Sequence, residues 1–476
     1  MTDTLLTAFA QAVAAHGPDT ALVDADGRDI SFDQLDARAR ALAAAWASRG
    51  MGQGDRILIA MPIGPDLYAS LAAIWSLGAV AVLPEPAMGL AGLRNAIATA
   101  GVTGICASGG YRALKLLPAL WRVPLFTPQQ TGGGGVGVGK VNAEDLALIS
   151  FTSGSTGKPK AIPRSHGFLM AQHDAVAPLL QSAKAERDLV AFPVFVLINL
   201  AAGRTSILPN WKMSQLDRVT PHRLTAWMDS TGATRALLPP ALCETLVNGD
   251  VPRGLHTLFT GGGPVFPDLV ARLTHDGQLG VTAVYGSTEA EPIAHLETAT
   301  MTAKDVTAMQ GGAGLLAGAP VPAVAVRIVD DEIQVAGDHV NAGYLDPAHN
   351  AENKVRDGDT IWHRTGDAGY LDDQGRLWLL GRHGSAVQTD QGPLYPFAIE
   401  TAARLWPGVD AAALVPTSGG GILAIAGQVA RLPDWVTAAA AFGITDVRHC
   451  ASLPMDRRHR SKIDLKRLRK QLGVAG

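Results

Sequence analysis

The chain has 476 residues, of which 47% are hydrophobic and 17% charged, and its formal net charge at neutral pH is -3. This composition is typical of a folded globular protein, and the charge balance gives no overall attraction to nucleic acid or to an acidic membrane surface. At roughly 150 residues per structural unit, the length corresponds to two or three units.

The N-terminal residues, from Met1 to Leu5, carry no basic segment followed by an apolar run. No later stretch stays apolar for the roughly 20 residues that a membrane-spanning helix needs. We therefore predict a cytoplasmic protein with no membrane span and no nucleic-acid partner. The cysteines Cys106, Cys243 and Cys450 are far apart and lack CxxC spacing, so we expect small buried side chains rather than a disulfide framework or a zinc site.

Apolar periodicity predicts the first elements of the fold. Ser31 is a typical N-cap for a helix that runs to Ala47, because the residues after it place apolar side chains at helical spacing. A short apolar strand follows at residues 56–60, then a helix at about 65–77 and a second strand at 79–83. This alternation predicts a doubly wound α/β domain with parallel strands.

A glycine-rich run at residues 131–139 contains a formal GxGxxG pattern. That pattern occurs in dinucleotide-binding turns, but repeated glycine also produces it through composition alone. We interpret this run as a flexible connector.

The stronger phosphate-binding pattern begins directly afterwards. An apolar strand at residues 146–151 leads into the hydroxyl-rich and glycine-rich segment 152–160, where backbone N–H groups, hydroxyls and lysines can all contact phosphate oxygens. It is not a Walker loop, because only two residues separate Gly154 from Gly157 and Pro159 occupies the Ser/Thr position. This difference disfavours a Walker-type ATPase. An ordinary Ser/Gly surface loop is the alternative for this segment taken alone.

Segment 152–160 resembles the phosphate loop of the adenylate-forming superfamily, which includes acyl-CoA synthetases, peptide-synthetase adenylation domains and luciferases. Each further motif is weak alone, but they follow in the order of that family. These motifs are Thr260–Pro264, Tyr285–Glu289, Arg364–Asp367, Gly381–Arg382 and His459–Ile463.

The resemblance implies that the protein uses ATP and Mg²⁺ to activate a small-molecule carboxylic acid. The acid would attack the α-phosphate, and the charge that develops there needs a metal ion and a cation to stabilise it. By this resemblance Glu289 holds the metal, and the catalytic residues are Lys462, Thr288 and Arg382. The implied ATP-binding residues are Thr152, Ser153, Gly154, Ser155, Thr156, Gly157, Lys158, Gly262, Gly263, Tyr285, Gly286, Ser287 and Asp367. Taken alone, the basic segment around Lys462 would be interpreted as a solvated helix.

Among the subfamilies, the chain most resembles the β-lactone synthetases of bacterial olefin biosynthesis. Val196 stands where many superfamily members carry histidine, and an unusual Glu291–Pro292 follows the Tyr285–Glu289 motif. We expect Phe195, Val196 and Asn199 to line the acyl pocket, although core packing is an equal alternative for them. The loop around Gly392 differs from that of CoA ligases, which favours ring closure by the substrate's own hydroxyl group.

Three alternatives remain open at this point. The same adenylate would also serve transfer to CoA, to a carrier-protein thiol or to an amine, and a non-catalytic relative would keep the motifs as a nucleotide pocket. For the architecture, the resemblance implies a large N-terminal α/β domain, residues 1–381, and a smaller mobile α+β C-terminal domain, residues 382–476, which carries Lys462.

Overall fold

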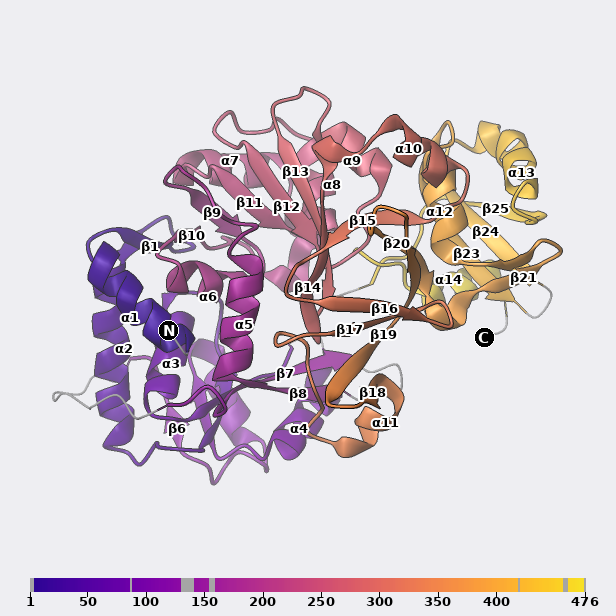
Figure 1. The fold of residues 1–476 in the computed structure, drawn as a ribbon. Coiled ribbons are helices and arrows are strands. Elements are labelled where there is room, and N and C mark those ends of the chain that lie inside the picture. The colour runs from indigo at the N-terminus through magenta and orange to yellow at the C-terminus, as the bar shows by residue number, and fades with distance from the viewer. Residues whose placement is uncertain are drawn as a thin grey trace.

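The computed structural model describes residues 4–85, 88–129, 141–153, 159–417, 420–456 and 461–474. Two predicted segments, the glycine-rich run 131–139 and the centre of the phosphate loop at 154–158, lie outside the described residues. Figure 1 shows two sheets in the N-terminal and central parts of the chain and a smaller unit at the C-terminal end.

The first sheet has six strands in the order β6-β5-β3-β4-β7-β8. All neighbours are parallel except β7 and β8, which form a hairpin. The strand bounds are β3 Arg56–Ala60, β4 Val80–Leu83, β5 Gly104–Ala107, β6 Leu125–Phe126, β7 Leu146–Ser153 and β8 Pro159–Ser165. The helices of this region are α1 Leu5–His16, α2 Phe32–Ala47, α3 Pro65–Ser76, α4 Gly89–Ala100 and α5 His166–Val176.

Helix α2 begins where the sequence predicts. The Ser31 hydroxyl accepts a hydrogen bond from the Gln34 amide at 3.2 Å, while Oε1 of Gln34 accepts one from the Ser31 amide at 3.0 Å. This reciprocal pair is a capping box, and it satisfies amide groups that the first turn leaves without partners. The buried face of α2 includes Leu35 and Trp46, which are at most 1% exposed.

The second sheet has fourteen strands, thirteen of them in the order β16-β17-β19-β20-β15-β14-β13-β12-β11-β9-β10-β1-β2, with β18 paired to β19. Its bounds are β1 Thr20–Val23, β2 Asp29–Ser31, β9 Arg187–Val190, β10 Thr205–Ile207, β11 Arg235–Leu238, β12 Thr257–Gly261, β13 Gly280–Ser287, β14 Ala290–Glu297, β15 Leu315–Pro320, β16 Ala325–Val329, β17 Glu332–Ala336, β18 Lys354–Asp357, β19 Thr360–Leu371 and β20 Leu377–Arg382. Its helices are α6 Pro193–Ala201, α7 Pro221–Thr231, α8 Pro240–Val247, α9 Pro267–Leu273, α10 Ala303–Gln310 and α11 Asn350–Asn353.

This sheet changes direction at β13. From β1 through β10, β9, β11 and β12 to β13 the neighbours are parallel, whereas every pair from β13 to β16 is antiparallel. The predicted α/β fold class is confirmed, but the antiparallel half was not predicted. Loops at the carboxyl ends of parallel strands usually carry ligand sites in α/β proteins, so β12 and β13 direct attention to the segments that follow them.

The largest apolar core lies between the two sheets. It joins Leu148 of the first sheet to Leu237 and Phe259 of the second, and it includes side chains of α2, α3, α5 and α6. Helix α5 lies in front of the junction between the sheets in Figure 1. All three cysteines are buried, as predicted.

The C-terminal part has its own sheet, in the order β23-β24-β25, and a short hairpin of β21 and β22. Its elements are β21 Val387–Thr389, β22 Gly392–Leu394, α12 Pro396–Arg404, β23 Val409–Thr417, β24 Gly420–Gly427, α13 Leu432–Ala440, β25 Asp446–Cys450 and α14 Leu465–Leu472. Two apolar clusters lie within it, one around Trp435 and one around Leu468. A domain boundary after β20, at residue 381 or 382, remains our proposal.

The C-terminal part docks on α9 through α12. Arg404 donates two hydrogen bonds to the carboxylate of Asp268, at 2.6 and 2.7 Å, and its guanidinium lies 4.7 Å from the ring centre of Phe266. The ring of Phe266 also packs edge-on against Phe397. A bidentate Arg–carboxylate pair is geometrically specific, so this contact defines how the two parts meet.

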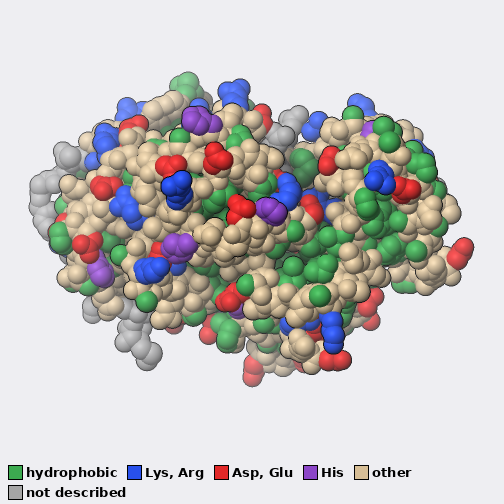
Figure 2. Space-filling view, turned by 90° about the horizontal axis from the view of Figure 1, so that it is seen from above, with side chains coloured by type: hydrophobic (Ala, Val, Ile, Leu, Met, Phe, Trp, Pro, Cys, Tyr) green, Lys and Arg blue, Asp and Glu red, His purple; other side chains and the backbone are tan. Residues whose placement is uncertain are grey.

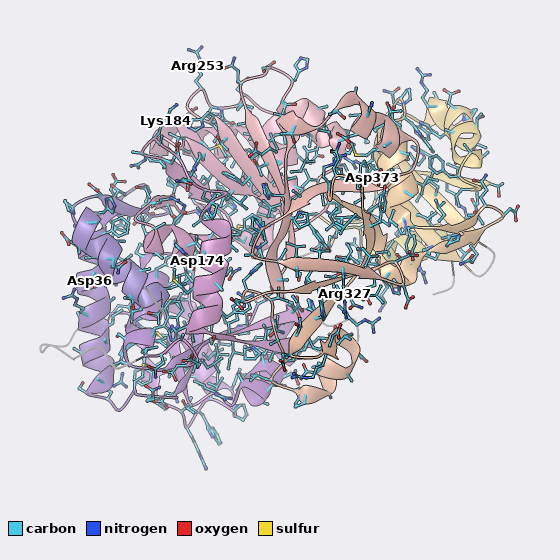
Figure 3. All side chains as sticks on the ribbon, in the orientation of Figure 1. Asp36, Asp174, Lys184, Arg253, Arg327 and Asp373 are labelled. Atoms are coloured by element: carbon cyan, nitrogen blue, oxygen red, sulfur yellow. The ribbon has the colours of Figure 1, made fainter. Side chains whose placement is uncertain are left out.

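The surface carries mixed charge. Figure 2 shows basic and acidic side chains interspersed over the visible face, and Lys184, Arg253 and Asp373 are exposed at the outside of the molecule (Figure 3). Among the helices of the described residues, none has both the length and the apolarity to cross a bilayer.

Candidate active site

The residues from Tyr285 to Glu289 form the end of β13 and the turn into β14. Ser287 pairs with Ala290 across this hairpin, so Thr288 and Glu289 are the two residues of its turn. The Tyr285–Glu289 motif therefore presents a hydroxyl and a carboxylate together at the tip of a hairpin, where the parallel half of the sheet ends.

Glu289 lies beside the start of the predicted phosphate loop. Its Oε1 atom accepts hydrogen bonds from the hydroxyls of Thr152 and Tyr344, each at 3.1 Å. Thr152 belongs to β7, of which Ser153 is the last residue. The structure thus joins the first hydroxyl of the loop to the predicted metal-binding carboxylate.

Two lysines approach the ring of Tyr344. Nζ of Lys160 lies 5.5 Å from the ring centre and Nζ of Lys354 lies 5.3 Å from it. Lys354 also approaches Nδ1 of His363 at 3.2 Å. Burial lowers the pKa of Lys354 to about 7, against the attraction of the Glu289 charge, and burial together with Lys354 lowers the pKa of His363 to about 4.

This cluster of basic side chains around Tyr344 was not predicted from the sequence. Lys354 and His363 are opposite each other on the paired strands β18 and β19. The one available signal was the position of His363 immediately before the Arg364–Asp367 motif.

Asp367 connects three of the predicted motifs. One of its oxygens accepts a hydrogen bond from the Tyr285 hydroxyl at 2.9 Å, and the other lies 3.2 Å from Nη1 of Arg382. Asp367 and Arg382 are also partners in the pairing of β19 with β20. Burial and the Asp367 charge raise the pKa of Tyr285 well above its ordinary value, so this phenol is a hydrogen-bond donor at neutral pH.

Glycine is required at the turns that frame these residues. A Cβ atom at Gly286 would lie 2.9 Å from the carbonyl oxygen of Ala290, and one at Gly261 would overlap the carbonyl oxygen of Val284. Gly262 has a φ of +77°, in the left-handed region that favours glycine. The hydroxyl of Ser287 is buried, and within the described ranges it has no hydrogen-bond partner.

The C-terminal loop that carries Lys462 reaches the glycine turn. A Cβ atom at Gly263 would lie 2.5 Å from Cβ of Ser461, so the two backbones are in close contact. The Lys462 amide donates to Oδ1 of Asp456 at 3.0 Å, and the Asp456 amide donates back to the Lys462 carbonyl at 2.8 Å. Lys462 itself is exposed and precedes α14, so the basic helix begins at Leu465 and contains Lys466, Arg467, Arg469 and Lys470 but not Lys462.

The remaining predicted phosphate-binding residues cannot be placed in this site from the structure. Gly154, Ser155, Thr156, Gly157 and Lys158 lie outside the described residues. Their assignment remains a prediction from the sequence motif.

A cavity opens beside the glycine turn. Its wall includes Thr260 and Gly261, the last two residues of β12, and Val284 of β13. Most of the remaining wall is apolar, and that part includes Val176, Leu180, Phe192, Phe195, Leu237 and Phe259. A mostly apolar wall with a few polar groups is typical of a small-molecule site.

The structure corrects two of the three predicted acyl-pocket residues. Phe195 lines the cavity, but Val196 is fully buried in the core between the sheets. Asn199 is also fully buried, and its Nδ2 atom donates to Asp188 at 2.9 Å and to Ser206 at 3.1 Å. A polar residue on an apolar helix is here part of a buried hydrogen-bond network rather than of the cavity wall.

Glu291 contributes a carboxyl group to the same cavity. Burial raises its pKa to about 7, and the charge of Arg164 opposes this shift. Arg164 is 4% exposed and donates to the carbonyl oxygen of Thr288. The sequence had marked Glu291 as unusual but assigned it no role.

The chain is similar in sequence to a known enzyme family and to known enzymes. The model of the AMP-binding enzyme family matches residues 9–345. The olefin β-lactone synthetase of Xanthomonas campestris pv. campestris is 32% identical over 434 residues, which are 81% of this chain and 78% of that protein.

Two solved structures share the fold over nearly the whole chain. The amide bond synthetase of Marinactinospora thermotolerans has a TM-score of 0.80 at 22% identity, with 98% of this chain and 99% of that one covered. The O-succinylbenzoate coenzyme A synthetase of Bacillus subtilis, in complex with ATP and magnesium ion, has a TM-score of 0.78 at 20% identity, with 96% and 99% covered. The chain therefore belongs to the AMP-binding family of adenylate-forming enzymes.

Proposed function

We propose that this enzyme activates a β-hydroxy carboxylic acid with ATP and then closes the acid to a β-lactone. In the first step a carboxylate oxygen bonds to the α-phosphorus of ATP and pyrophosphate leaves. In the second step the β-hydroxyl oxygen bonds to the carbonyl carbon, AMP leaves, and the hydroxyl proton is lost. The substrate's own hydroxyl is the acceptor, so the second step needs no second substrate.

One observation carries the first step of this proposal. The apolar cavity and the nucleotide motifs share a wall, because Thr260 and Gly261 line the cavity while Gly262 and Gly263 follow them directly. An acid in the cavity would therefore meet a nucleotide at this turn. Ser461 touches the same turn, which supports a position for Lys462 close to the reacting groups.

The proposed nucleotide contacts follow from the geometry of Asp367. Its carboxylate can accept hydrogen bonds from both ribose hydroxyls, while Tyr285 and Arg382 hold its orientation. Thr152 and Thr288 would donate to phosphate oxygens, and Lys462 would stabilise the charge that develops during the attack.

The donor set fits magnesium. Among the described residues no three His, Cys, Asp or Glu side chains form a cluster that could hold a metal ion. A single carboxylate is nevertheless what Mg²⁺ commonly takes from a protein when substrate phosphates supply further oxygen ligands. Glu289 would hold the ion, which would neutralise charge on the phosphates. The hydroxyls of Thr152 and Tyr344 orient that carboxylate.

The second step is supported by the relatives. The olefin β-lactone synthetase is similar over most of both chains, and a β-hydroxyl group held near an acyl adenylate reacts intramolecularly. Transfer to CoA, to a carrier-protein thiol or to an amine would begin from the same adenylate. These acceptors are the alternatives for the second step.

Isotope transfer tests the first step without knowledge of the acceptor. An acid labelled with ¹⁸O in its carboxylate should leave one ¹⁸O atom in AMP, because the attacking oxygen remains on phosphorus when the acyl carbon is released. Mass spectrometry of AMP measures this transfer. Unlabelled AMP, or ADP with inorganic phosphate, would contradict adenylation, whereas a non-catalytic relative would form neither product.

A further inference from the structure

Glu291 stands out in an otherwise apolar cavity wall. Among the lining residues it is the one ionisable side chain, and most of its neighbours there are aliphatic or aromatic. It follows the hairpin turn that contains Thr288 and Glu289, so its carboxyl group lies in the part of the wall next to the proposed site of attack.

The carboxyl group of Glu291 has no hydrogen-bond partner among the residues that the structure describes. Within the described residues, neither of its oxygens accepts a hydrogen bond or forms an ion pair. Arg164 is the charged group that acts on it most directly: one of its terminal nitrogens donates to the Thr288 carbonyl, and its buried Nε has no hydrogen-bond partner within the described residues.

A half-buried polar group without a partner is costly unless a ligand completes its hydrogen bonding. A carboxyl group therefore argues for a ligand that carries a hydrogen-bond donor at this depth of the cavity. An acid with an apolar chain and a hydroxyl near its carboxylate has that pattern.

We propose that Glu291 is a specificity-determining residue, which accepts a hydrogen bond from a hydroxyl group on the acyl chain of the acid. This assignment rests on the proposed function. It makes Glu291 the residue that distinguishes a 3-hydroxy acid from the same acid without the hydroxyl, and it positions that hydroxyl beside the activated carbonyl group.

The test compares paired acids in three forms of the full-length enzyme: wild type, Glu291→Leu and Glu291→Gln. Straight-chain 3-hydroxy acids of four to ten carbons are each matched with the unsubstituted acid of equal length, and kcat/KM is measured from acid-dependent pyrophosphate release. We expect the wild-type enzyme to prefer the hydroxy acids. In Glu291→Leu this preference should fall about 3- to 100-fold, the range from loss of a neutral hydrogen bond to loss of one with a charged group.

The loss should be selective. Glu291→Leu should retain turnover of the unsubstituted acids, and Glu291→Gln, which keeps an acceptor oxygen, should retain part of the preference. Glu297→Gln, at the exposed end of the same strand, is the matched control and should behave as wild type. Retained ATP-induced thermal stabilisation identifies folded variants.

Two results separate the possible failures. If folded Glu291→Leu keeps the preference for hydroxy acids, Glu291 does not bind the hydroxyl group of the acid. The same conclusion holds if the folded variant loses activity equally with both acids of each pair. If the wild-type enzyme releases no pyrophosphate with any acid, the proposed function itself is wrong.

Discussion

Thr152 and Glu289, which are 137 residues apart in the chain, meet in a hydrogen bond of 3.1 Å. Thr152 is the second-last residue of β7, the strand before the phosphate loop, and Glu289 occupies the turn between β13 and β14. This contact joins the two sheets at the point where the cavity, the glycine turn and the Lys462 loop also come together. The geometry supports a single site for ATP and acid.

Replacement of Glu289 by glutamine should weaken magnesium-dependent turnover. The amide cannot supply the negative charge that a hard cation prefers, so we expect kcat to fall roughly 10²-fold and the magnesium requirement to rise. Titration of pyrophosphate release with Mg²⁺, after removal of metal by EDTA, measures both effects. Glu352→Gln, an exposed change on α11, is the control. An unchanged magnesium titration would show that Glu289 does not hold the metal.

Replacement of Lys462 by alanine should lower adenylation without unfolding the enzyme. Lys462 is exposed. The hydrogen bonds that hold its loop to Asp456 use the backbone amide and carbonyl of Lys462, and alanine keeps both groups. Loss of a cation at the reacting phosphate should reduce kcat by about 10²- to 10³-fold, with a smaller effect on ATP binding. Lys466→Ala, on the exposed face of α14, should be nearly neutral. Equal activity of the two variants would reject the proposed role.

Phe195 and Asn199 lie on the same helix but should respond differently. Phe195→Ala enlarges the cavity, so it should shift the preference among acids of different length. Asn199→Ala removes hydrogen bonds to Asp188 and Ser206, which should cost about 1–3 kcal/mol of stability and leave that preference unchanged. Thermal unfolding and a panel of acids measure the two effects. An altered acid preference in Asn199→Ala would overturn its assignment to the core.

Glu400 should make the stability of the C-terminal part depend on pH. Its side chain is buried and accepts a hydrogen bond from the Leu414 amide at 2.8 Å, and burial raises its pKa from 4.5 to about 7. Below about pH 4.5 both the folded and unfolded states hold the proton. Between pH 4.5 and 7 the unfolded state ionises first, so this group's contribution to stability is lost as the pH rises through 7.

Glu400→Gln removes this titration while it keeps an oxygen for the Leu414 amide. Relative to wild type, the variant should therefore gain about 2–3 kcal/mol of stability between pH 5 and pH 8. Unfolding midpoints at the two pH values measure this gain. A variant whose midpoint follows that of the wild-type enzyme at both values would contradict a raised pKa at Glu400.

Local patterns in the sequence were enough to predict several helices and strands near the N-terminus. The capping box at Ser31 and the strand at 56–60 depend on neighbouring residues, and both agree with the structure. The antiparallel half of the second sheet depends on pairings between distant strands, for which the sequence carries no comparable local signal. Local propensity therefore accounts for the elements but not for their order in the sheet.

Part of the site was also predictable from the sequence, and part was not. Tyr285, Asp367 and Arg382 belong to short motifs, and the structure brings them together as the order of the motifs implied. Lys354 was missed because its contact with His363 arises from a hairpin register. Asn199 was misplaced because an amide on an apolar helix serves a pocket or a buried network equally well, and only the positions of Asp188 and Ser206 distinguish the two.

The most direct test of the account is mass-spectrometric product analysis after the enzyme is incubated with ATP, Mg²⁺ and a panel of 3-hydroxy acids, with and without CoA. The account predicts AMP, pyrophosphate and a product one water lighter than the acid, formed equally in both conditions. A thioester that appears only with CoA would contradict β-lactone closure and leave adenylation intact. Absence of AMP and of any acid-derived product across the panel would contradict the account as a whole.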